Sequence, residues 1–196
     1  MNERNGVASP EIEGQIKREP DLDPEVEARR AAALARVHKF GDPSLRTRTR
    51  QVDRFDEALV SEVLRMSEIM DGALGVGLAA PQLGVLHRVL VYRVPPALEA
   101  AALVNPEIEW AGREQEIAEE GCLSLPGVLV DVERPIYVRV RAQNERGDPV
   151  LIEASGLEAR VIQHEVDHLD GVLILDRTTR EQRKQAVRAL REAEAA

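Results

Sequence analysis

Two histidines and a glutamate in residues 161–171, which read VIQHEVDHLDG, have the types and spacing of a metal site. His164 and His168 are four positions apart, so on a helix both can direct a nitrogen at one ion. Glu165 follows the first histidine, where an H-E-x-x-H run places a carboxylate that can take a proton from bound water. The run predicts a hydrolase only if a third ligand exists, because without one these are two core histidines bonded to backbone.

The sequence offers three schemes for that third ligand. The extended motif H-E-x-x-H-x-x-G-x-x-H is excluded, because Ile174 stands where its last histidine belongs. Glu181 or Glu192, in the polar segment that follows, would complete an H-E-x-x-H metallopeptidase. Cys122 lies upstream in EEGCLSLPG and would give one thiolate and two imidazoles with an open fourth position, as in catalytic sites. A binding module with a structural ion would need a fourth protein ligand, and no candidate stands nearby.

The elements that must position these residues follow from periodicity and turn chemistry. Ser155 and Glu158 form an S-x-x-E capping box and Gly171 marks a helix end, so the histidines are expected on a helix of about four turns. Helices are also expected from Pro24 to about residue 40 and over residues 55–72. Short antiparallel strands are expected in the β-branched segments 87–94, 101–110, 127–133 and 136–154.

The chain divides into one domain with two tails. Its 196 residues suit a single core, which we place over residues 26–180. Residues 1–25 are acidic, polar and poor in apolar side chains, so we expect a flexible extension. Residues 177–196 are expected to form a C-terminal helix that begins with a Thr178–Glu181 capping box and lies on the surface.

Composition excludes several classes of protein. A net charge of −9 argues against a protein that wraps nucleic acid. A single cysteine allows no intramolecular disulfide, which favours a cytoplasmic location. We find neither an apolar signal region nor a run of about 18 apolar residues, so neither export nor membrane insertion is expected.

Three separated segments resemble the signature motifs of peptide deformylases in order and spacing: GVGLAAPQ at 75–82, EGCLS at 120–124 and QHEVDHL at 163–169. HKFGDPSLR and ERPIYVRV are also similar to that family, and the resemblance covers roughly residues 35–180. It implies an α+β fold in which small antiparallel β-sheets surround a central helix that carries the metal motif, with a C-terminal surface helix. The implied activity removes formyl from the N-terminal formylmethionine of newly synthesised proteins, which gives formate and a free N-terminal methionine.

The resemblance also implies a role for each motif residue. Cys122, His164 and His168 would hold one divalent ion, ferrous iron in the cell, although zinc, nickel and cobalt suit the same ligands. Glu165 would act as the proton acceptor and donor. The Gln82 side-chain amide and the Leu123 backbone N–H would stabilise the oxyanion.

For the substrate, an N-formylmethionyl nascent peptide, the resemblance implies strand-like pairing with Gly77. The methionine side chain would enter an apolar slot of Val76, Leu157 and Val161, the last two on a buried stripe that the histidines continue. The C-terminal helix could dock on the ribosome near the exit tunnel, with no direct nucleic-acid specificity.

Two ion-pairing hypotheses concern the surroundings of the motifs. Glu120 and Arg134 are expected to pair and fix the cysteine loop. Asp167 is expected either to orient a ligand imidazole or to face solvent.

Overall fold

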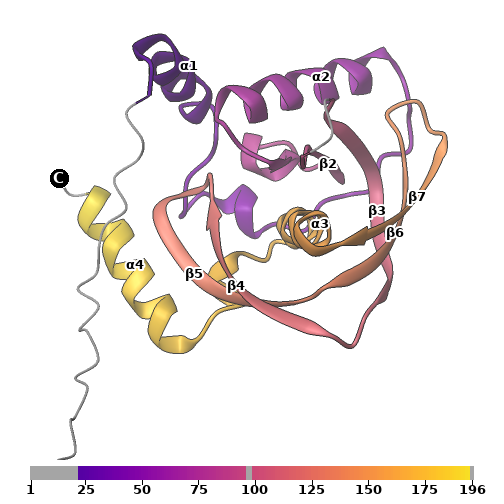
Figure 1. The fold of residues 1–196 in the computed structure, drawn as a ribbon. Coiled ribbons are helices and arrows are strands. Elements are labelled where there is room, and N and C mark those ends of the chain that lie inside the picture. Colours follow the sequence, from indigo (N-terminus) through magenta and orange to yellow (C-terminus); the bar gives the residue numbers. More distant parts are fainter. Residues whose placement is uncertain (1–21, 96–98, 195–196) are drawn as a thin grey trace, which may run out of the picture.

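The computed structural model describes residues 22–95 and 99–194 (Figure 1). The expected extension over residues 1–25 therefore falls largely outside the described residues. Its last two residues belong to a helix instead, because Pro24 is the first residue of α1 and the Asp23 side chain accepts a hydrogen bond from the Glu25 N–H.

Within the described residues the α-helices are α1 (Pro24–Leu34), α2 (Glu57–Gly72), α3 (Gly156–Leu169) and α4 (Arg180–Glu194). Three short 3₁₀ turns join them to the strands: η1 (Pro43–Arg46), η2 (Ala80–Leu83) and η3 (Ile174–Asp176). The first helix ends at Leu34, earlier than expected, because the chain from His38 to Phe40 pairs with other loops: the His38 N–H donates to the Gln82 carbonyl and the Phe40 N–H to the Ser124 carbonyl. No described helix is long and apolar enough to cross a membrane.

Two antiparallel sheets carry the rest of the fold. The larger has the order β1-β2-β3-β6-β7, and the smaller is the pair β4-β5. The bounds are β1 (Gly77–Ala79), β2 (Val89–Tyr92), β3 (Ala101–Ala111), β4 (Gln115–Cys122), β5 (Leu125–Pro135), β6 (Tyr137–Gln143) and β7 (Pro149–Ser155). The chain is thus α+β with antiparallel sheets, as expected.

Strand alternation shows why these segments form sheets. In β5 the side chains of Val128, Val130 and Val132 are buried, while Leu129 and Asp131 between them are exposed. This period of two is what a strand needs when only one of its faces meets the core. Strand β2 is buried at every residue, because α2 and α3 both contact it.

The core consists of three clusters, each beneath a different helix. The first joins α2 to β1 and β2, and the second joins α3 to the five-stranded sheet. The third lies between β5 and α4 and includes Ala186 and Leu190. The C-terminal helix is therefore on the surface but not wholly solvated, because one side of it closes a cluster.

Helix α3 contacts both sheets. It packs against β1, β2, β6 and β7 of the larger sheet and against β5 of the smaller one. Figure 1 shows it nearly end-on between them. Its bounds agree with the sequence prediction, yet the capping box is absent: Ser155 makes no capping hydrogen bond and Glu158 accepts one from the Tyr92 hydroxyl. The C-terminal helix begins at Arg180 rather than at residue 177, and Thr179 rather than Thr178 accepts the hydrogen bond of the Gln182 N–H.

Candidate metal centre

The fold brings together the three side chains that the sequence nominated as ligands. Cys122 ends β4, and His164 and His168 lie one turn apart on α3. One ligand atom from each lies within 4.8 Å of the others, and the thiol sulfur is 3.2 Å from the His168 Nε2. Among the described residues no other group of three metal-ligating side chains is this close.

A carboxylate orients the first imidazole. Glu120 Oε2 accepts a hydrogen bond of 3.0 Å from the His164 Nδ1. The other ring nitrogen of His164, Nε2, therefore remains available on the side of the Cys122 thiol. Burial lowers the pKa of His164, but hydrogen bonds with Cys122 and Glu120 raise it well above its usual value. Burial lowers the pKa of His168 well below its usual value. The two rings thus lie in unlike surroundings although they share one helix face.

Glu120 is the centre of a buried ion cluster. Arg134 donates two hydrogen bonds to it, of 2.6 and 3.0 Å, and Arg160 donates another of 2.8 Å. Burial raises the pKa of Glu120, yet its bonds with His164 and Arg134 lower it to about 2. The expected Glu120–Arg134 pair is confirmed, with both side chains only 5% exposed, and it holds a histidine as well as the cysteine strand.

Asp167 does neither of the two things that the sequence predicted. Its carboxylate accepts a hydrogen bond of 2.8 Å from Arg134 and two from Arg177, and it is buried. Both expectations were wrong, because Arg134 on β5 and Arg177 in the turn after α3 donate hydrogen bonds to the carboxylate. Asp167 therefore links α3 to β5 through Arg134, and to the turn before α4 through Arg177.

Glu165 is buried beside the ion cluster of Glu120 and Arg134. It is 4% exposed, and its Oε2 has no hydrogen-bond partner within the described residues. Burial raises its pKa to about 7. The carboxylate packs against Gly77, where a Cβ atom would lie 2.3 Å from Oε1. Only glycine leaves room for this carboxylate, which is poised to exchange a proton near neutral pH.

The thiol, the two imidazoles and this unpartnered carboxylate fit a bound divalent ion. One sulfur and two nitrogens are suitable ligands for zinc or for ferrous iron, and three protein ligands leave a position for a reactant. Glu165 follows the ligand His164 in the sequence, and its charge raises the pKa of that imidazole. The donor set is therefore that of a catalytic site.

Gln82 is buried and its amide has a fixed orientation. Its Oε1 accepts a hydrogen bond of 2.9 Å from the Ala79 N–H. Its Nε2 lies 3.2 Å from the Ser124 hydroxyl and 3.8 Å from the Cys122 sulfur. Sequence reasoning did not assign Ser124 a role, although it belongs to the same EGCLS segment as the cysteine. A donor is therefore held beside the cysteine ligand.

Strand β1 is the edge strand of the larger sheet beside the same centre; its residues are buried, and no described strand pairs with its outer edge. The Arg93 N–H donates to the Val76 carbonyl, and Leu78 pairs with Val91, so these residues direct their backbone groups at β2. Because alternate residues of a strand point to opposite sides, Gly77 directs its N–H and C=O away from β2. Leu123 lies close by, with a side-chain methyl 3.1 Å from where a Cβ of Gly75 would be. An extended chain could add to this edge.

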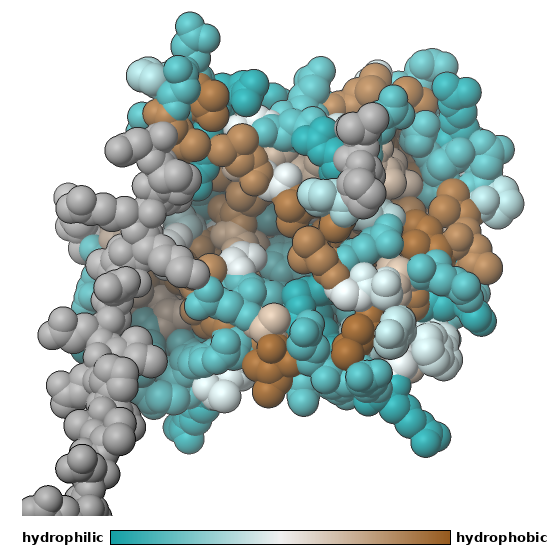
Figure 2. All heavy atoms as spheres, viewed as in Figure 1, coloured by the Kyte–Doolittle hydropathy of each residue, from teal (hydrophilic) through white to brown (hydrophobic). Residues whose placement is uncertain are grey.

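The proposed apolar slot is open rather than buried. Val161 is 6% exposed, but Leu157 is 55% and Val76 46% exposed. The expected buried stripe therefore begins at Val161, one turn after the exposed Leu157. Figure 2 shows that this face of the molecule is hollowed below α1, with hydrophobic residues inside the hollow.

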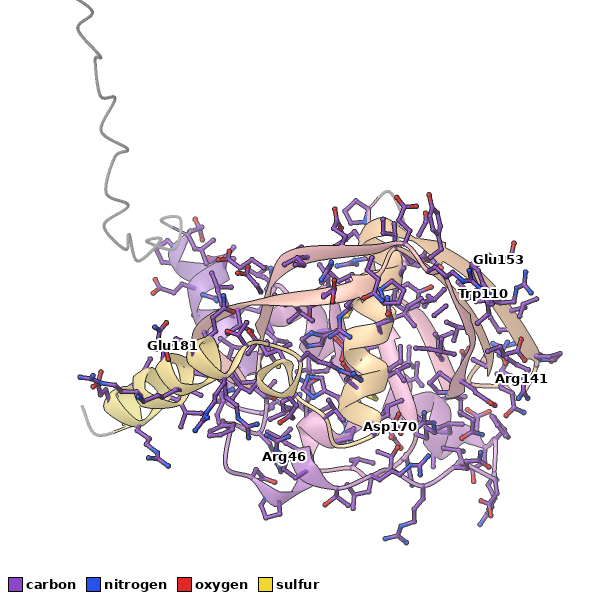
Figure 3. The ribbon with its side chains drawn as sticks, turned by 90° about the horizontal axis from the view of Figure 1, so that it is seen from below. Arg46, Trp110, Arg141, Glu153, Asp170 and Glu181 are labelled. Atoms are coloured by element: carbon purple, nitrogen blue, oxygen red, sulfur yellow. The ribbon has the colours of Figure 1, made fainter. Side chains whose placement is uncertain are left out.

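The alternative carboxylate ligands are elsewhere. Glu181 accepts a hydrogen bond from Gln185, and Glu192 accepts one from Arg188, all on the exposed side of α4. Figure 3 shows Glu181 on α4, well apart from α3, whose C-terminal end is marked by Asp170. The metallopeptidase scheme therefore lacks its third ligand in this fold.

An α+β fold with this Cys-His-His set and a buried glutamate is the arrangement of a metal-dependent hydrolase. The chain belongs to the peptide deformylase family, since the family model described as Polypeptide deformylase matches residues 34–184.

Individual relatives agree with this assignment. A peptide deformylase of Thermotoga neapolitana is 53% identical over 144 residues, which cover 74% of this chain and 87% of the relative. One of Acidothermus cellulolyticus is 48% identical over 162 residues, 83% of this chain and 88% of the relative. The crystal structure of a Synechococcus elongatus peptide deformylase in complex with actinonin has a TM-score of 0.75 and 41% identity, covering 78% of this chain and 85% of that one.

Proposed function

We propose that this protein hydrolyses the formyl group from the N-terminal formylmethionine of newly synthesised proteins, releasing formate and a free N-terminal methionine. The observation that carries the proposal is the grouping of Cys122, His164 and His168 beside the helix that buries Glu165, in a chain that belongs to the peptide deformylase family. The arrangement of both sheets around α3, which makes it the central helix, supports the same assignment.

The resident ion would be held by Cys122, His164 and His168. When bound, a divalent ion supplies Lewis acidity, which makes water acidic enough to act as a nucleophile near neutral pH. We propose ferrous iron as the ion in the cell, and zinc, nickel and cobalt are compatible with the same ligands. The hydrogen bond that Glu120 accepts from His164 keeps that ring in one orientation.

The chain's own residues supply the proton transfers and the oxyanion contacts. Glu165 accepts a proton from the attacking water and delivers it to the departing amine, for which a pKa of about 7 is suited. The Gln82 Nε2–H and the Leu123 backbone N–H donate to the oxyanion, and loss of one such donor typically costs about 3–4 kcal/mol. The Ala79 N–H prevents the Gln82 amide from turning its oxygen towards the oxyanion.

The substrate pairs with the free edge of β1. Its backbone exchanges hydrogen bonds with Gly77, as an added strand does. The methionine side chain rests on Val161, with Val76 and Leu157 at the open rim of the slot. An open rim suits a substrate that is the end of a long chain.

The basic side of α4 supports a second partner. A groove of about 680 Å³ there is lined by Arg180, Arg183, Lys184, Val187, Arg188, Arg191 and Glu192. Five cations in a chain of net charge −9 favour an anionic surface, and we propose docking at the ribosome near the exit tunnel, in the cytoplasm.

Formate release from formyl-Met-Ala-Ser by protein prepared anaerobically with iron tests the proposed function. We expect turnover of this peptide and none of acetyl-Met-Ala-Ser or of casein. Casein cleavage without formate release would contradict the proposal and favour the metallopeptidase hypothesis.

A further inference from the structure

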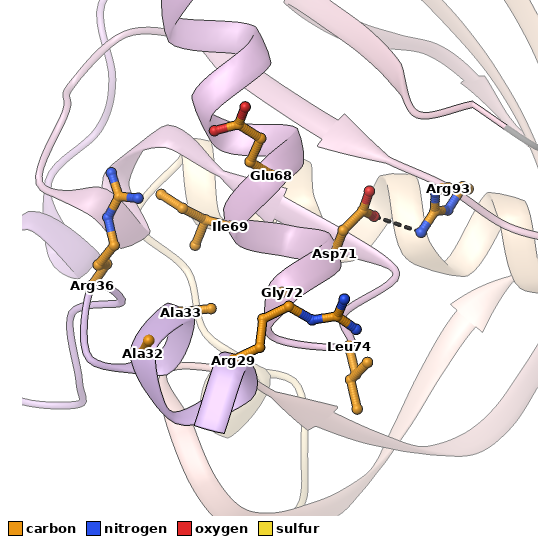
Figure 4. Close-up of a pocket in the computed structure, with 10 residues that line it drawn as sticks. All are labelled: Arg29, Ala32, Ala33, Arg36, Glu68, Ile69, Asp71, Gly72, Leu74 and Arg93. Carbon is orange, nitrogen blue, oxygen red and sulfur yellow. Dashed lines mark hydrogen bonds and ion pairs between the residues drawn. The ribbon is translucent and has the colours of Figure 1, made fainter. Parts of the chain in front are cut away.

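Another hollow lies between α1 and α2 (Figure 4). This α1–α2 groove has a volume of about 620 Å³. Its apolar surface comes from Ala32, Ala33, Ile69 and Leu74. Arg29 from α1 extends across its middle, and Figure 4 shows Leu74 beside the same arginine. The groove has no part in the chemistry described above.

Positive charge prevails around this groove. Arg29, Arg36 and Arg93 line it with only two carboxylates, those of Glu68 and Asp71, of which Asp71 pairs with Arg93 at 2.5 Å. Within the part of the chain that the structure describes, neither Arg29 nor Arg36 has an ion-pair partner. In a chain of net charge −9 this is a local reversal of sign.

Two contacts fix the direction of α3 relative to β1. Tyr92, which pairs with Gly77, donates to Glu158 in the first turn of α3 at 3.0 Å. Arg88, just before β2, pairs with Asp170 at the other end of α3 at 2.8 Å. Because β2 runs antiparallel to β1, the start of α3 lies towards the beginning of β1 and its end towards the end of β1.

The direction of the substrate follows from that of the helix. The metal ligands occupy the second half of α3, near Ala79 and the Gln82 amide, whereas Val161 lies a turn nearer to the start of β1. A peptide with its formyl group at the ligands and its first side chain on Val161 therefore runs antiparallel to β1. Its later residues pass Gly75 and reach Leu74.

Leu74 joins the substrate path to the groove. An extended substrate advances about 3.4 Å per residue, so its residues after about the third lie beyond Val76, where the chain of the enzyme turns into the C-terminal end of α2. Leu74 is 49% exposed, has a positive φ of 58° and lines the groove. This conformation belongs to the end of α2, where the Leu74 N–H donates to the Asp71 carbonyl and the Gly75 N–H to the Met70 carbonyl, and it leaves the Leu74 side chain exposed at the groove.

We propose that the α1–α2 groove binds the substrate residues that follow the third, and that Arg29 and Arg36 favour acidic side chains there. The apolar surface of the groove contacts the aliphatic parts of the substrate between those acidic side chains. This inference rests on the proposed function, because it requires the formyl end at the metal centre.

The test compares three substrates of the iron-loaded enzyme: formyl-Met-Ala-Ser, formyl-Met-Ala-Ser-Glu-Glu-Leu and formyl-Met-Ala-Ser-Lys-Lys-Leu. We expect the acidic hexapeptide to have a KM about fivefold lower than the basic one, with equal kcat, because exposed ion pairs contribute little each. The difference should fade at high salt. Equal KM values at low salt would overturn the proposal.

Variants assign the effect to the groove. Arg29→Glu/Arg36→Glu should reverse the preference and leave tripeptide kinetics unchanged. Arg65→Glu/Arg113→Glu changes the net charge equally at two exposed sites outside the groove and should keep the preference. A preference that survives in the first variant, or is lost in the second, would contradict the proposal.

A binding measurement separates this inference from the function itself. Fluorescence anisotropy of dye-labelled hexapeptides reports the same preference without turnover. If the wild type releases no formate from the tripeptide, the proposed function fails. The groove proposal then stands only if acidic peptides still bind more tightly and the Arg29→Glu/Arg36→Glu variant removes the difference.

Discussion

Helices α3 and α4 are nearly equal in length, at 14 and 15 residues, and both are rich in charged side chains. Helix α3 buries four polar side chains, Gln163, Glu165, Asp167 and His168, whereas the described part of α4 buries only Ala186 and Leu190. Burial without a partner is costly, so buried polar groups must be bonded or serve chemistry. On α4 the side chains of Glu181, Gln185 and Glu192 face water and need no buried partner.

The largest expected effect concerns the third ligand. Cys122→Ala should lose the ion and reduce formate release to background, whereas Glu181→Gln on α4 should retain both. Metal analysis after dialysis, together with the formate assay, measures this. If the Cys122→Ala variant kept its ion and the Glu181→Gln variant lost it, the third ligand would be Glu181 on α4.

The next effect is on stability. Arg134→Ala removes a buried cation that serves both Glu120 and Asp167, so the free energy of unfolding should fall by about 3–5 kcal/mol. Urea denaturation measures the loss. Arg188→Ala removes an exposed pair on α4 and should leave the denaturation curve unchanged. Equal losses in the two variants would contradict the contrast between the helices.

A smaller effect is expected from the glycine beneath the base. Gly77→Ala should reduce kcat about 100-fold with unchanged ion content, because its Cβ would displace the Glu165 carboxylate. Gly112→Ala is the matched control, since its Cβ would meet Tyr137 at an ordinary 3.4 Å. Stopped assays with excess substrate give kcat for both. A Gly77→Ala enzyme with wild-type kcat would show that the close packing is irrelevant.

The smallest of these effects concerns the substrate slot. Val161→Asp on α3 should raise KM for formyl-Met peptides more than about tenfold without changing ion content, because a carboxylate is costly in an apolar slot. Val187→Asp on α4 should leave KM unaltered. Initial rates over a range of substrate concentrations distinguish the two, and an unaltered KM in the Val161 variant would remove this residue from the slot.

The comparison also shows what the sequence could predict. Local rules gave α3 nearly its observed bounds, and the ligand count led to Cys122, which the fold brings beside the histidines. Long-range partners were beyond such rules. The sequence pattern does not indicate that Arg134 and Arg177 both donate hydrogen bonds to Asp167. It also does not indicate that Glu158 accepts a hydrogen bond from Tyr92 instead of forming a capping box.

Exposure at the start of α3 was also mispredicted, for a physical reason. Helical spacing placed Leu157 on the same face as Val161, but only the sheet determines how far that face is covered. Ser124 was missed because a serine in a loop has many uses, and only the folded chain shows it beside the Gln82 amide. Periodicity predicts faces, whereas tertiary contacts decide which part of a face is buried.

The central claim is that Glu165 is buried on α3 as a proton carrier rather than as a structural carboxylate. Formate release by the Glu165→Gln variant, measured beside the wild type at equal ion content, tests it most directly. A fall in kcat of about 10²–10⁴-fold with KM little changed is the predicted result. A variant that retains the wild-type rate with its ion bound would contradict the account.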